Sequence, residues 1–157
     1  MQADIAIVHQ RVIGGEPIGD LIVKSSHLRS DIVLDGAIIP NIIDEIPILA
    51  IAGVFSEGSF SVRDANDLRY KESDRITAIC ANLRLLGIDV NEYDDGFAFV
   101  PKKGLVHQVF NSYDDHRIAM AFGIASLALH GESTIKAADC VSISFPSFWH
   151  TIETLKQ

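Results

Sequence analysis

The chain has 157 residues, with 13 Lys and Arg against 21 Asp and Glu, a formal net charge of −8 and a pI near 5.1. Apolar residues make up 48% and charged residues 22%, which excludes a disordered chain and indicates a single globular domain over residues 1–157. The acidic balance disfavours a nucleic-acid-binding surface, which needs clustered positive charge. The longest apolar stretch, 118–129, is too short for a membrane span of about 20 residues, and no secretory signal opens the chain, so we expect a cytoplasmic protein.

Residue types that commonly hold metals or cofactors are sparse and scattered. The six histidines show no metal-ligand spacing, and the glycines form none of the loops that bind nucleotide phosphates, so we expect no metal and no cofactor. The two cysteines, Cys80 and Cys140, both lie in apolar stretches. Two buried thiols in a reducing compartment are the favoured interpretation, and a single disulfide is the alternative.

Residues 31–100 predict one complete unit of strands and helices. The expected order is strand, helix, strand, helix, strand, strand, over residues 31–35, 42–55, 59–64, 70–86, 89–93 and 97–100. The last two strands form a hairpin, and Asp95-Gly96 between them suits a type I′ turn, in which both central residues need positive φ. This βαβαββ order indicates an α/β domain.

Residues 105–156 repeat the beginning of the same order. A strand, a helix, a strand and a helix are expected over residues 105–110, 115–130, 133–138 and 145–156, without the two strands that would complete the unit. Near the other end, residues 5–9 and 21–24 predict two strands with no helix before them, and Gly14-Gly15 predicts a turn. We therefore expect the chain to be a truncated piece of a longer repeat protein, with a coincidence of loose strand assignments as the alternative.

Two of the expected helices are apolar on all sides. These are residues 46–55 and most of residues 118–129, and the lack of a polar stripe predicts that both are buried on nearly every side. The helix expected over 70–86 is amphipathic instead, and its apolar residues at helical spacing are Ile76, Ile79, Leu83 and Leu86. Buried helices surrounded by short strands describe an α/β domain with its helices inside.

Positive charge clusters at one place in this acidic chain. Four of the 13 cationic residues lie close together in the sequence: Arg63, Arg69, Lys71 and Arg75. Lys71 and Arg75 are expected on one face of the helix over 70–86, where like charges repel by about 0.2–0.5 kcal/mol and the helix dipole also disfavours cations. A bound anion would offset both costs. The alternative is a solvated face on which Glu72 and Asp74 neutralise the cations.

Two further helix starts carry charge. One of the two aspartates before His116 can cap the next helix, and Arg117 then lies at the mouth of the core, where a guanidinium can bind a carboxylate or phosphate. A capping box with a salt-bridged arginine is the alternative. At the third helix start, Asp44 and Glu45 are either ordinary partners of the helix dipole or, facing the cations, supply a general base.

These motifs together resemble one enzyme family. Two segments of this chain, RYKESDRI at residues 69–76 and DHRIAM at residues 115–120, resemble a pair of family signatures. The family is 3-phosphoshikimate 1-carboxyvinyltransferase, also called EPSP synthase. IDEIP at residues 43–47 and SFP at residues 144–146 also resemble segments that the family has at these places. The resemblance covers essentially the whole chain.

The resemblance implies a fold and a reaction. The family has two similar domains, each an inside-out α/β barrel of three βαβαββ units, with the active site between them, so this chain would be most of the C-terminal domain. The family transfers the enolpyruvyl group of phosphoenolpyruvate to the 5-hydroxyl of shikimate 3-phosphate, releasing phosphate, in aromatic amino acid biosynthesis. The implied partners are these two substrates and the missing N-terminal domain, with no nucleic acid or membrane. We expect the chain alone to be inactive.

The resemblance also implies roles for single residues. By motif match, Asp44 resembles the base near the shikimate hydroxyl, and Glu72 resembles the group that transfers a proton at the methylene carbon. Lys71 resembles the family lysine that contacts the shikimate near the reacting centre. The residues that resemble the clamp on the phosphoenolpyruvate carboxylate and phosphate are Arg75, Arg117 and, beside them, His116.

Two positions depart from the family pattern. Ile143 stands where many members have a lysine, and we leave it out of the site. Asp67 stands where many members have an asparagine, and we retain it as a candidate substrate-binding residue. Two other functions stay open. One is the related enolpyruvyl transfer to UDP-N-acetylglucosamine, and the other is a non-catalytic module that binds small anions.

Overall fold

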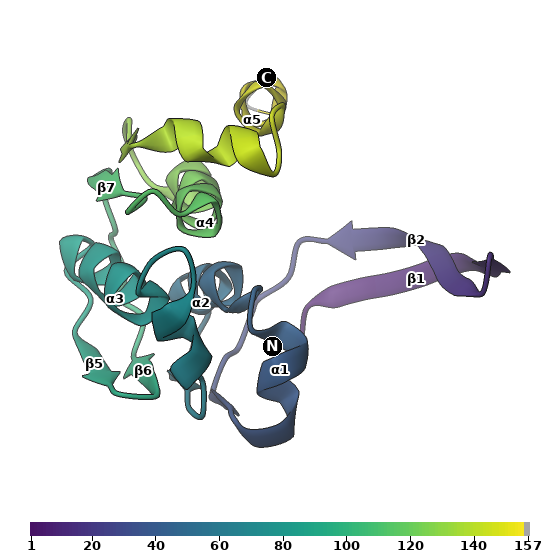
Figure 1. Cartoon of the computed structure of the whole chain (residues 1–157), viewed down its shortest axis with the longest axis horizontal. Helices are drawn as coiled ribbons and strands as arrows, with labels where there is room; N and C mark the ends of the chain where they lie inside the picture. Colours follow the sequence, from purple (N-terminus) through teal and green to yellow (C-terminus); the bar gives the residue numbers. More distant parts are fainter. Residues whose placement is uncertain (156–157) are drawn as a thin grey trace.

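The computed structural model describes residues 1–155, and its elements follow the α/β order expected from the sequence. In Figure 1, a body of helices and small sheets carries a two-stranded arm. The elements of the first unit are β3 (Ile32–Leu34), η1 (Gly36–Ile38), α1 (Ile39–Ile42), α2 (Ile46–Val54), β4 (Phe60–Val62), η2 (Asn66–Tyr70), α3 (Arg75–Leu85), β5 (Val90–Tyr93) and β6 (Gly96–Phe99), where η denotes a 3₁₀ helix.

The strands of the first unit form one four-stranded sheet in the order β3-β4-β6-β5. β3 and β4 are parallel and are joined by the crossover through α2, whereas β6 is antiparallel to both β4 and β5. Phe60, Phe97 and Phe99 stack on one another, with ring centroids 5.4–6.4 Å apart, and each is at most 3% exposed. The predicted βαβαββ order is therefore confirmed.

The helix expected over 42–55 is divided in two. α1 ends at Ile42, a turn covers residues 43–45, and α2 begins at Ile46 with Pro47 in its first turn. Proline suits this position because the first N–H groups of a helix have no partner within the helix. Asp44 and Glu45 consequently lie directly before α2.

The helix expected over 70–86 begins at Arg75, five residues later than predicted. Asp74 is its N-cap and accepts a hydrogen bond from the backbone N–H of Thr77 at 3.0 Å. The prediction that Lys71 and Arg75 share a helix face is therefore wrong, because Lys71 has an extended backbone in the loop before α3. The predicted apolar face is confirmed, since all four of its members are buried: Ile76, Ile79, Leu83 and Leu86.

The turn between β5 and β6 is not the predicted type I′ turn at Asp95-Gly96. The turn residues are Asp94 and Asp95, Gly96 is the first residue of β6, and none of the three has a positive φ. A Cβ at Gly96 would overlap the carbonyl oxygen of Val62 on β4. Glycine is required here by the close approach of two backbones rather than by an unusual φ.

The second unit repeats the beginning of the first. Its elements are β7 (Val109–Asn111), α4 (His116–Ala128), β8 (Thr134–Lys136), η3 (Ala138–Ile143) and α5 (Phe148–Leu155). β7 and β8 are parallel, so the expected strand, helix, strand, helix order is confirmed. Both strands are shorter than predicted, and the expected helix end at residue 156 lies outside the described residues.

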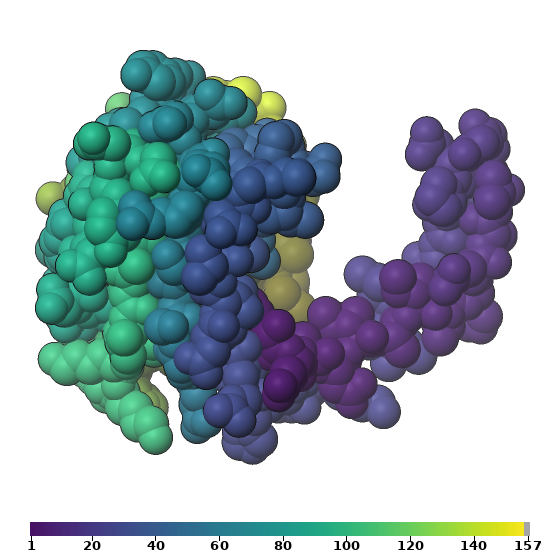
Figure 2. Space-filling model, turned by 90° about the horizontal axis from the view of Figure 1, so that it is seen from below, coloured from purple at the N-terminus to yellow at the C-terminus, as the bar shows by residue number. Residues whose placement is uncertain are grey.

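The N-terminal strands form an antiparallel hairpin, β1 (Asp4–Ile13) and β2 (Glu16–Lys24), joined by the expected turn at Gly14-Gly15. Both strands are longer than predicted because pairing continues beyond an irregularity between Val8 and Arg11. Figure 2 shows the hairpin as an arm that stands away from the body. Its apolar side chains are largely exposed within residues 1–155.

The α/β class is confirmed, but residues 1–155 form three separate sheets and not a closed barrel. The two apolar helices, α2 and α4, pack against each other in the body. They are less enclosed than predicted, because Ile48 is 39% and Leu127 is 40% exposed. No single helix within residues 1–155 is long and apolar enough to cross a membrane. The bent pair Gly36–Ile42 and Ile46–Val54 together has the length and composition of a membrane span, and the likeness is one of length and composition only.

Both cysteines are free, which confirms two thiols over a disulfide. Cys80 is buried, and burial raises the pKa of its thiol to about 12. Cys140 is half-buried rather than buried, and burial raises its pKa as well. A thiol with a raised pKa is a poor nucleophile at neutral pH.

We predict that Gly96→Ala lowers the free energy of unfolding by about 1–3 kcal/mol, because the new methyl group forces β4 and β6 apart. The variant Gly96→Asn distinguishes close packing against β4 from a requirement for positive φ at residue 96. Asparagine tolerates positive φ, so it would be the milder change in a type I′ turn, whereas close packing makes it at least as damaging as alanine. Urea unfolding of the two variants measures the difference, and a more stable Asn variant would contradict the packing explanation.

Candidate active site

Charged side chains from both units meet where three helices begin. They are Asp44 from the segment before α2, Lys71 and Glu72 from the loop before α3, Arg75 at the start of α3, and Arg117 in the first turn of α4. Ion pairs of 2.7–3.5 Å connect all five. Residues far apart in the sequence are thus in direct contact, and of the two alternatives for Asp44 the structure has the one in which it faces the cations.

Arg75 is the centre of this cluster. Its side chain is only 1% exposed, and each of its three nitrogen atoms donates to a carboxylate. Nε donates to Asp115 Oδ2 at 2.7 Å, Nη1 to Asp44 Oδ1 at 2.9 Å and Nη2 to Glu72 Oε2 at 2.7 Å. A substrate anion could reach this guanidinium only by displacing one of these carboxylates.

Asp115 is fully buried and has two functions at once. It is the N-cap of α4, where Oδ1 accepts from the backbone N–H groups of Arg117 at 2.9 Å and Ile118 at 3.4 Å, as expected for one of the two aspartates. It also binds Arg75 and accepts from Ser73 Oγ at 3.1 Å. Burial alone would raise the pKa of Asp115, but Arg75 and the two N–H donors outweigh it and hold the pKa below its ordinary value.

Asp44 lies among three cations. Lys71 Nζ is 3.3 Å, Arg75 Nη1 2.9 Å and Arg117 Nη2 3.5 Å from its carboxylate oxygens. Partial burial would raise the pKa of Asp44, but these cations outweigh it and lower the pKa. The carboxylate is therefore ionised at neutral pH.

Lys71 and Glu72 are the members of the cluster that come from the loop before α3. Their side chains are 29% and 49% exposed, and they project from the irregular loop that joins η2 to α3. Glu72 and Asp74 neutralise Arg75 and Arg69, as the alternative interpretation of the charge pattern required. The solvated face that this alternative described is not found, because Arg75 is buried.

The remaining predicted residues differ in their surroundings. His116 is half-buried in the first turn of α4, beside Arg117. Asp67 is exposed in η2, and its carboxylate makes no hydrogen bond or ion pair with any of residues 1–155. Ile143 is 81% exposed at the end of η3, away from any ion pair. The structure joins neither Asp67 nor Ile143 to the cluster.

An apolar groove of about 260 Å³ begins at the cluster. Asp44 and Arg117 form its charged end, and its other walls come from α2, α4 and the start of α5: Pro47, Ile48, Met120, Ala121, Ile124, Phe145 and Phe148. A ligand in this groove would therefore meet a cation and a carboxylate at one end only. Among residues 1–155, no group of three or more His, Cys, Asp or Glu side chains could hold a metal ion.

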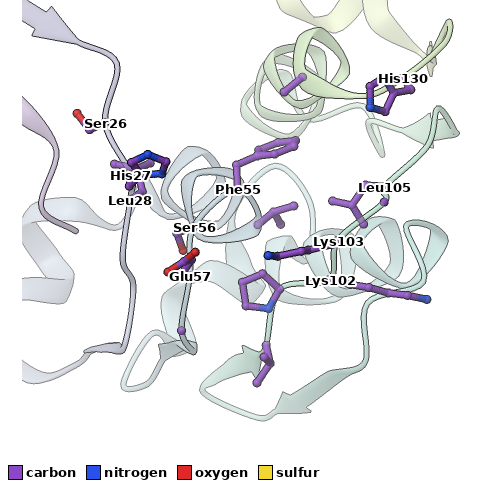
Figure 3. A pocket seen from close by; sticks show the side chains of 16 residues that line it. Ser26, His27, Leu28, Phe55, Ser56, Glu57, Lys102, Lys103, Leu105 and His130 are labelled. Atoms are coloured by element: carbon purple, nitrogen blue, oxygen red, sulfur yellow. The ribbon is translucent and has the colours of Figure 1, made fainter.

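A larger pocket, of about 600 Å³, lies elsewhere (Figure 3). It is lined by the ends of α2 and α4 and the linker after β6, including Phe55, Lys103 and His130. The cluster lies at the starts of the same two helices, so the length of α4 separates the two places by roughly 20 Å. No predicted site residue lines this pocket.

The contact between Arg75 and Asp115 was not expected from the sequence. The aspartate was interpreted as a cap, and the arginine as a cation on a helix face, paired with a bound anion or neutralised by Glu72 and Asp74. The available signal was an acidic cap that precedes an otherwise apolar helix, because a buried carboxylate requires a buried donor. The hydrogen bond from Ser73 to Asp115 was missed as well, because donors to a buried carboxylate were not sought in the sequence.

Comparisons with known proteins identify the family of this chain. The model of the EPSP synthase (3-phosphoshikimate 1-carboxyvinyltransferase) family matches residues 3–152. A 3-phosphoshikimate 1-carboxyvinyltransferase of Salinibacter ruber is 48% identical over 151 residues, which is 95% of this chain and 35% of that protein. The corresponding protein of Roseiflexus castenholzii is 43% identical over 100% of this chain and 36% of its own length. The structure of EPSP synthase from Acinetobacter baumannii superposes with a TM-score of 0.89 and 35% identity, covering 97% of this chain and 36% of that one.

Fold and site together define an α/β repeat domain that gathers charged residues where its helices begin. The family match extends over nearly all of it, and the relatives are well above 30% identical. The chain belongs to the EPSP synthase family. It spans about a third of the length of the curated relatives that it matches.

We predict that Arg75→Met lowers the free energy of unfolding by about 3–5 kcal/mol, because it leaves Asp115 as an uncompensated buried charge. Arg63→Met is the matched control. Arg63 forms an ion pair with Asp95 and lies over the Tyr93 ring at 3.6 Å, but its side chain is 41% exposed, so the loss is about 1 kcal/mol. Urea unfolding measures both. Adding Asp115→Asn to Arg75→Met recovers part of the loss, and equal losses for the two arginines would contradict this account.

We also predict that stability falls with acid below pH 4. Asp115 and Asp44 have folded-state pKa values below the unfolded value of about 3.9, so their contribution is complete above that pH and is lost as the pH falls through the folded pKa. Asp115→Asn is less stable at pH 7 and loses less on acidification. Urea unfolding between pH 7 and pH 2.5 tests this, with the exposed Asp89→Asn as control; a variant at Asp115 that keeps the full acid dependence would contradict the prediction.

Proposed function

We propose that this chain takes part in the transfer of the enolpyruvyl group from phosphoenolpyruvate to the 5-hydroxyl of shikimate 3-phosphate. The observation that carries the proposal is the cluster around Arg75, in which residues of both family signatures are in contact. The reaction starts when the hydroxyl oxygen bonds to C2 of phosphoenolpyruvate while C3 gains a proton. C3 then loses a proton as the C2–O bond to phosphate breaks, which releases inorganic phosphate.

Three groups can supply the proton transfers and the orientation of the substrates. Asp44 accepts the proton of the attacking hydroxyl, and Glu72 transfers the proton at the methylene carbon. Lys71, within 3.3 Å of Asp44, binds the shikimate substrate beside them. Positioned acids and bases of this kind contribute typically about 10²–10⁴-fold each.

The cations stabilise the negative charges of both substrates. Arg117, whose side chain is 33% exposed, is the accessible guanidinium for the carboxylate or phosphate of phosphoenolpyruvate, with His116 beside it. Arg75 is buried. A substrate carboxylate that displaces Glu72 or Asp44 would take the place of that side chain as an acceptor and could bind the guanidinium of Arg75 through two hydrogen bonds. Asp67 is retained as a candidate contact to the shikimate. The chemistry requires no metal or organic cofactor.

We further propose that residues 1–157 are one domain, equivalent to most of the C-terminal half of a two-domain transferase, and that the chain alone is inactive. The chain matches only 35–36% of the length of its relatives. The apolar groove beside Arg117 is open, and the arm is uncovered within residues 1–155. Two free thiols fit a reducing compartment, so we propose a cytoplasmic location.

The test measures phosphate release from phosphoenolpyruvate plus shikimate 3-phosphate. The chain is assayed alone and in a chimera in which it replaces the matching segment of the Salinibacter ruber relative. Release by the chimera only is the expected result. Release by the chain alone would contradict the two-domain proposal, and a folded but silent chimera would favour an anion-binding module. Exchanging shikimate 3-phosphate for UDP-N-acetylglucosamine tests the related transferase activity, which we expect to be absent.

In the same chimera, we predict that Glu72→Gln lowers kcat by about 10²–10⁴-fold, because the amide cannot transfer the proton at the methylene carbon. Glu57→Gln makes the same change at an exposed position beyond the other end of α2, and kcat should stay unchanged. Steady-state phosphate release measures both variants. Equal kcat values would remove Glu72 from the proton transfer.

A further inference from the structure

Arg69 lies at the end of η2, next to the cluster but outside it. Its side chain is 23% exposed and donates in three directions. Nε donates to the carbonyl oxygen of Asp94 at 2.7 Å, Nη2 to that of Tyr93 at 2.7 Å, and Nη1 to Asp74 Oδ2 at 2.7 Å. Arg69 therefore connects the turn between β5 and β6 to the N-cap of α3.

This connection closes the segment of residues 70–73, here called the closed loop, which consists of the last residue of η2 and the loop after it. Arg69 directly precedes the loop and Asp74 directly follows it, so their ion pair joins its two ends. Asp74 is itself fixed, because it caps α3 through the N–H of Thr77. Four residues held between two mutually bound anchors have few backbone conformations available to them.

The closed loop carries two groups of the cluster, Lys71 and Glu72. Each makes one ion pair, to Asp44 at 3.3 Å and to Arg75 at 2.7 Å respectively. A bound substrate competes for these pairs, so they cannot fix the loop while the substrate is bound. Arg69 binds Tyr93, Asp94 and Asp74, none of which belongs to the cluster, so a substrate bound at the cluster does not compete for these contacts.

We propose that Arg69 is a positioning residue, which fixes residues 70–73 and thereby orients Lys71 and Glu72 toward the substrates. This inference rests on the proposed function of those two residues. The geometry requires arginine in particular, because two carbonyl oxygens and one carboxylate are bound by three separate nitrogen atoms. A lysine has a single nitrogen on a flexible stem and cannot bridge the same acceptors.

Arg84, on α3, provides a control in the same unit, and like Arg69 it contacts β5. It forms an ion pair with Glu92 at 3.0 Å and donates to the carbonyl oxygen of Val90 at 3.3 Å. Like Arg69, it joins the helical side of the unit to β5, but it lies near the end of α3 and touches no residue of the loop. Arg84→Met therefore removes a similar contact without opening residues 70–73.

The experiment uses Arg69→Met, Arg69→Lys and Arg84→Met in two measurements. Amide hydrogen exchange of residues 70–73 is followed in the 157-residue chain, and kcat and KM are measured in the chimera after folding is verified by urea unfolding. For Arg69→Met we expect exchange at least about tenfold faster, because several charge-assisted hydrogen bonds are lost. We expect kcat to fall about 10²-fold, with a smaller effect on KM, because the reacting groups lose their orientation. We expect Arg69→Lys to give exchange rates and kcat values between those of Arg69→Met and the unsubstituted protein. Arg84→Met should match the unsubstituted protein in both measurements.

Two results would overturn the inference. One is unchanged exchange of residues 70–73 in Arg69→Met, and the other is a kcat per folded molecule equal to that of Arg84→Met. Failure of the proposed function looks different, since the unsubstituted chimera would then release no phosphate. Such silence would remove the catalytic part of the inference, while the exchange measurement would still decide whether Arg69 holds the loop.

Discussion

The buried ion pair between Arg75 and Asp115 is the interaction on which the site depends. Both side chains are at most 1% exposed, and burial of two charges costs several kcal/mol per ion unless further hydrogen bonds compensate. Here Asp115 also accepts from the first N–H groups of α4, and Arg75 also binds Asp44 and Glu72. Because the partners of this pair come from both units, we expect it to fix how the two units dock more than it adds to stability.

The same arrangement, a helix-capping aspartate that also binds an arginine, occurs twice, once fully buried and once partly exposed. Asp74 and Asp115 are the side-chain caps of α3 and α4, and each also accepts from an arginine, Arg69 and Arg75 respectively. A carboxylate placed between helix N–H groups and a guanidinium satisfies both, whereas the guanidinium alone would be repelled by the positive end of the helix dipole. Each pair thus lets a cation stand beside a helix start.

The charges of the cluster are balanced within the chain. Three cations, Lys71, Arg75 and Arg117, face the carboxylates of the chain itself. An incoming anion competes with these carboxylates for the same donors, so binding exchanges one set of ion pairs for another. In the proposed function, this exchange frees Asp44 or Glu72 to accept a proton, which links substrate binding to the acid–base groups.

The order of strands and helices, the apolar face of α3, the charged helix starts and the family were all predictable from the residues alone. They depend on local periodicity, on the chemistry of capping residues and on motifs that are contiguous in the chain. The start of α3 was misplaced because apolar spacing shows where a helix faces the core but not which polar residue caps it, and Asp74 is selected by Arg69 and Thr77. Gly96 was assigned to a turn because its contact with Val62 lies 34 residues away in sequence. The burial of Arg75 likewise depends on Asp115, 40 residues later, so it could be decided only by the packing of one unit against the other.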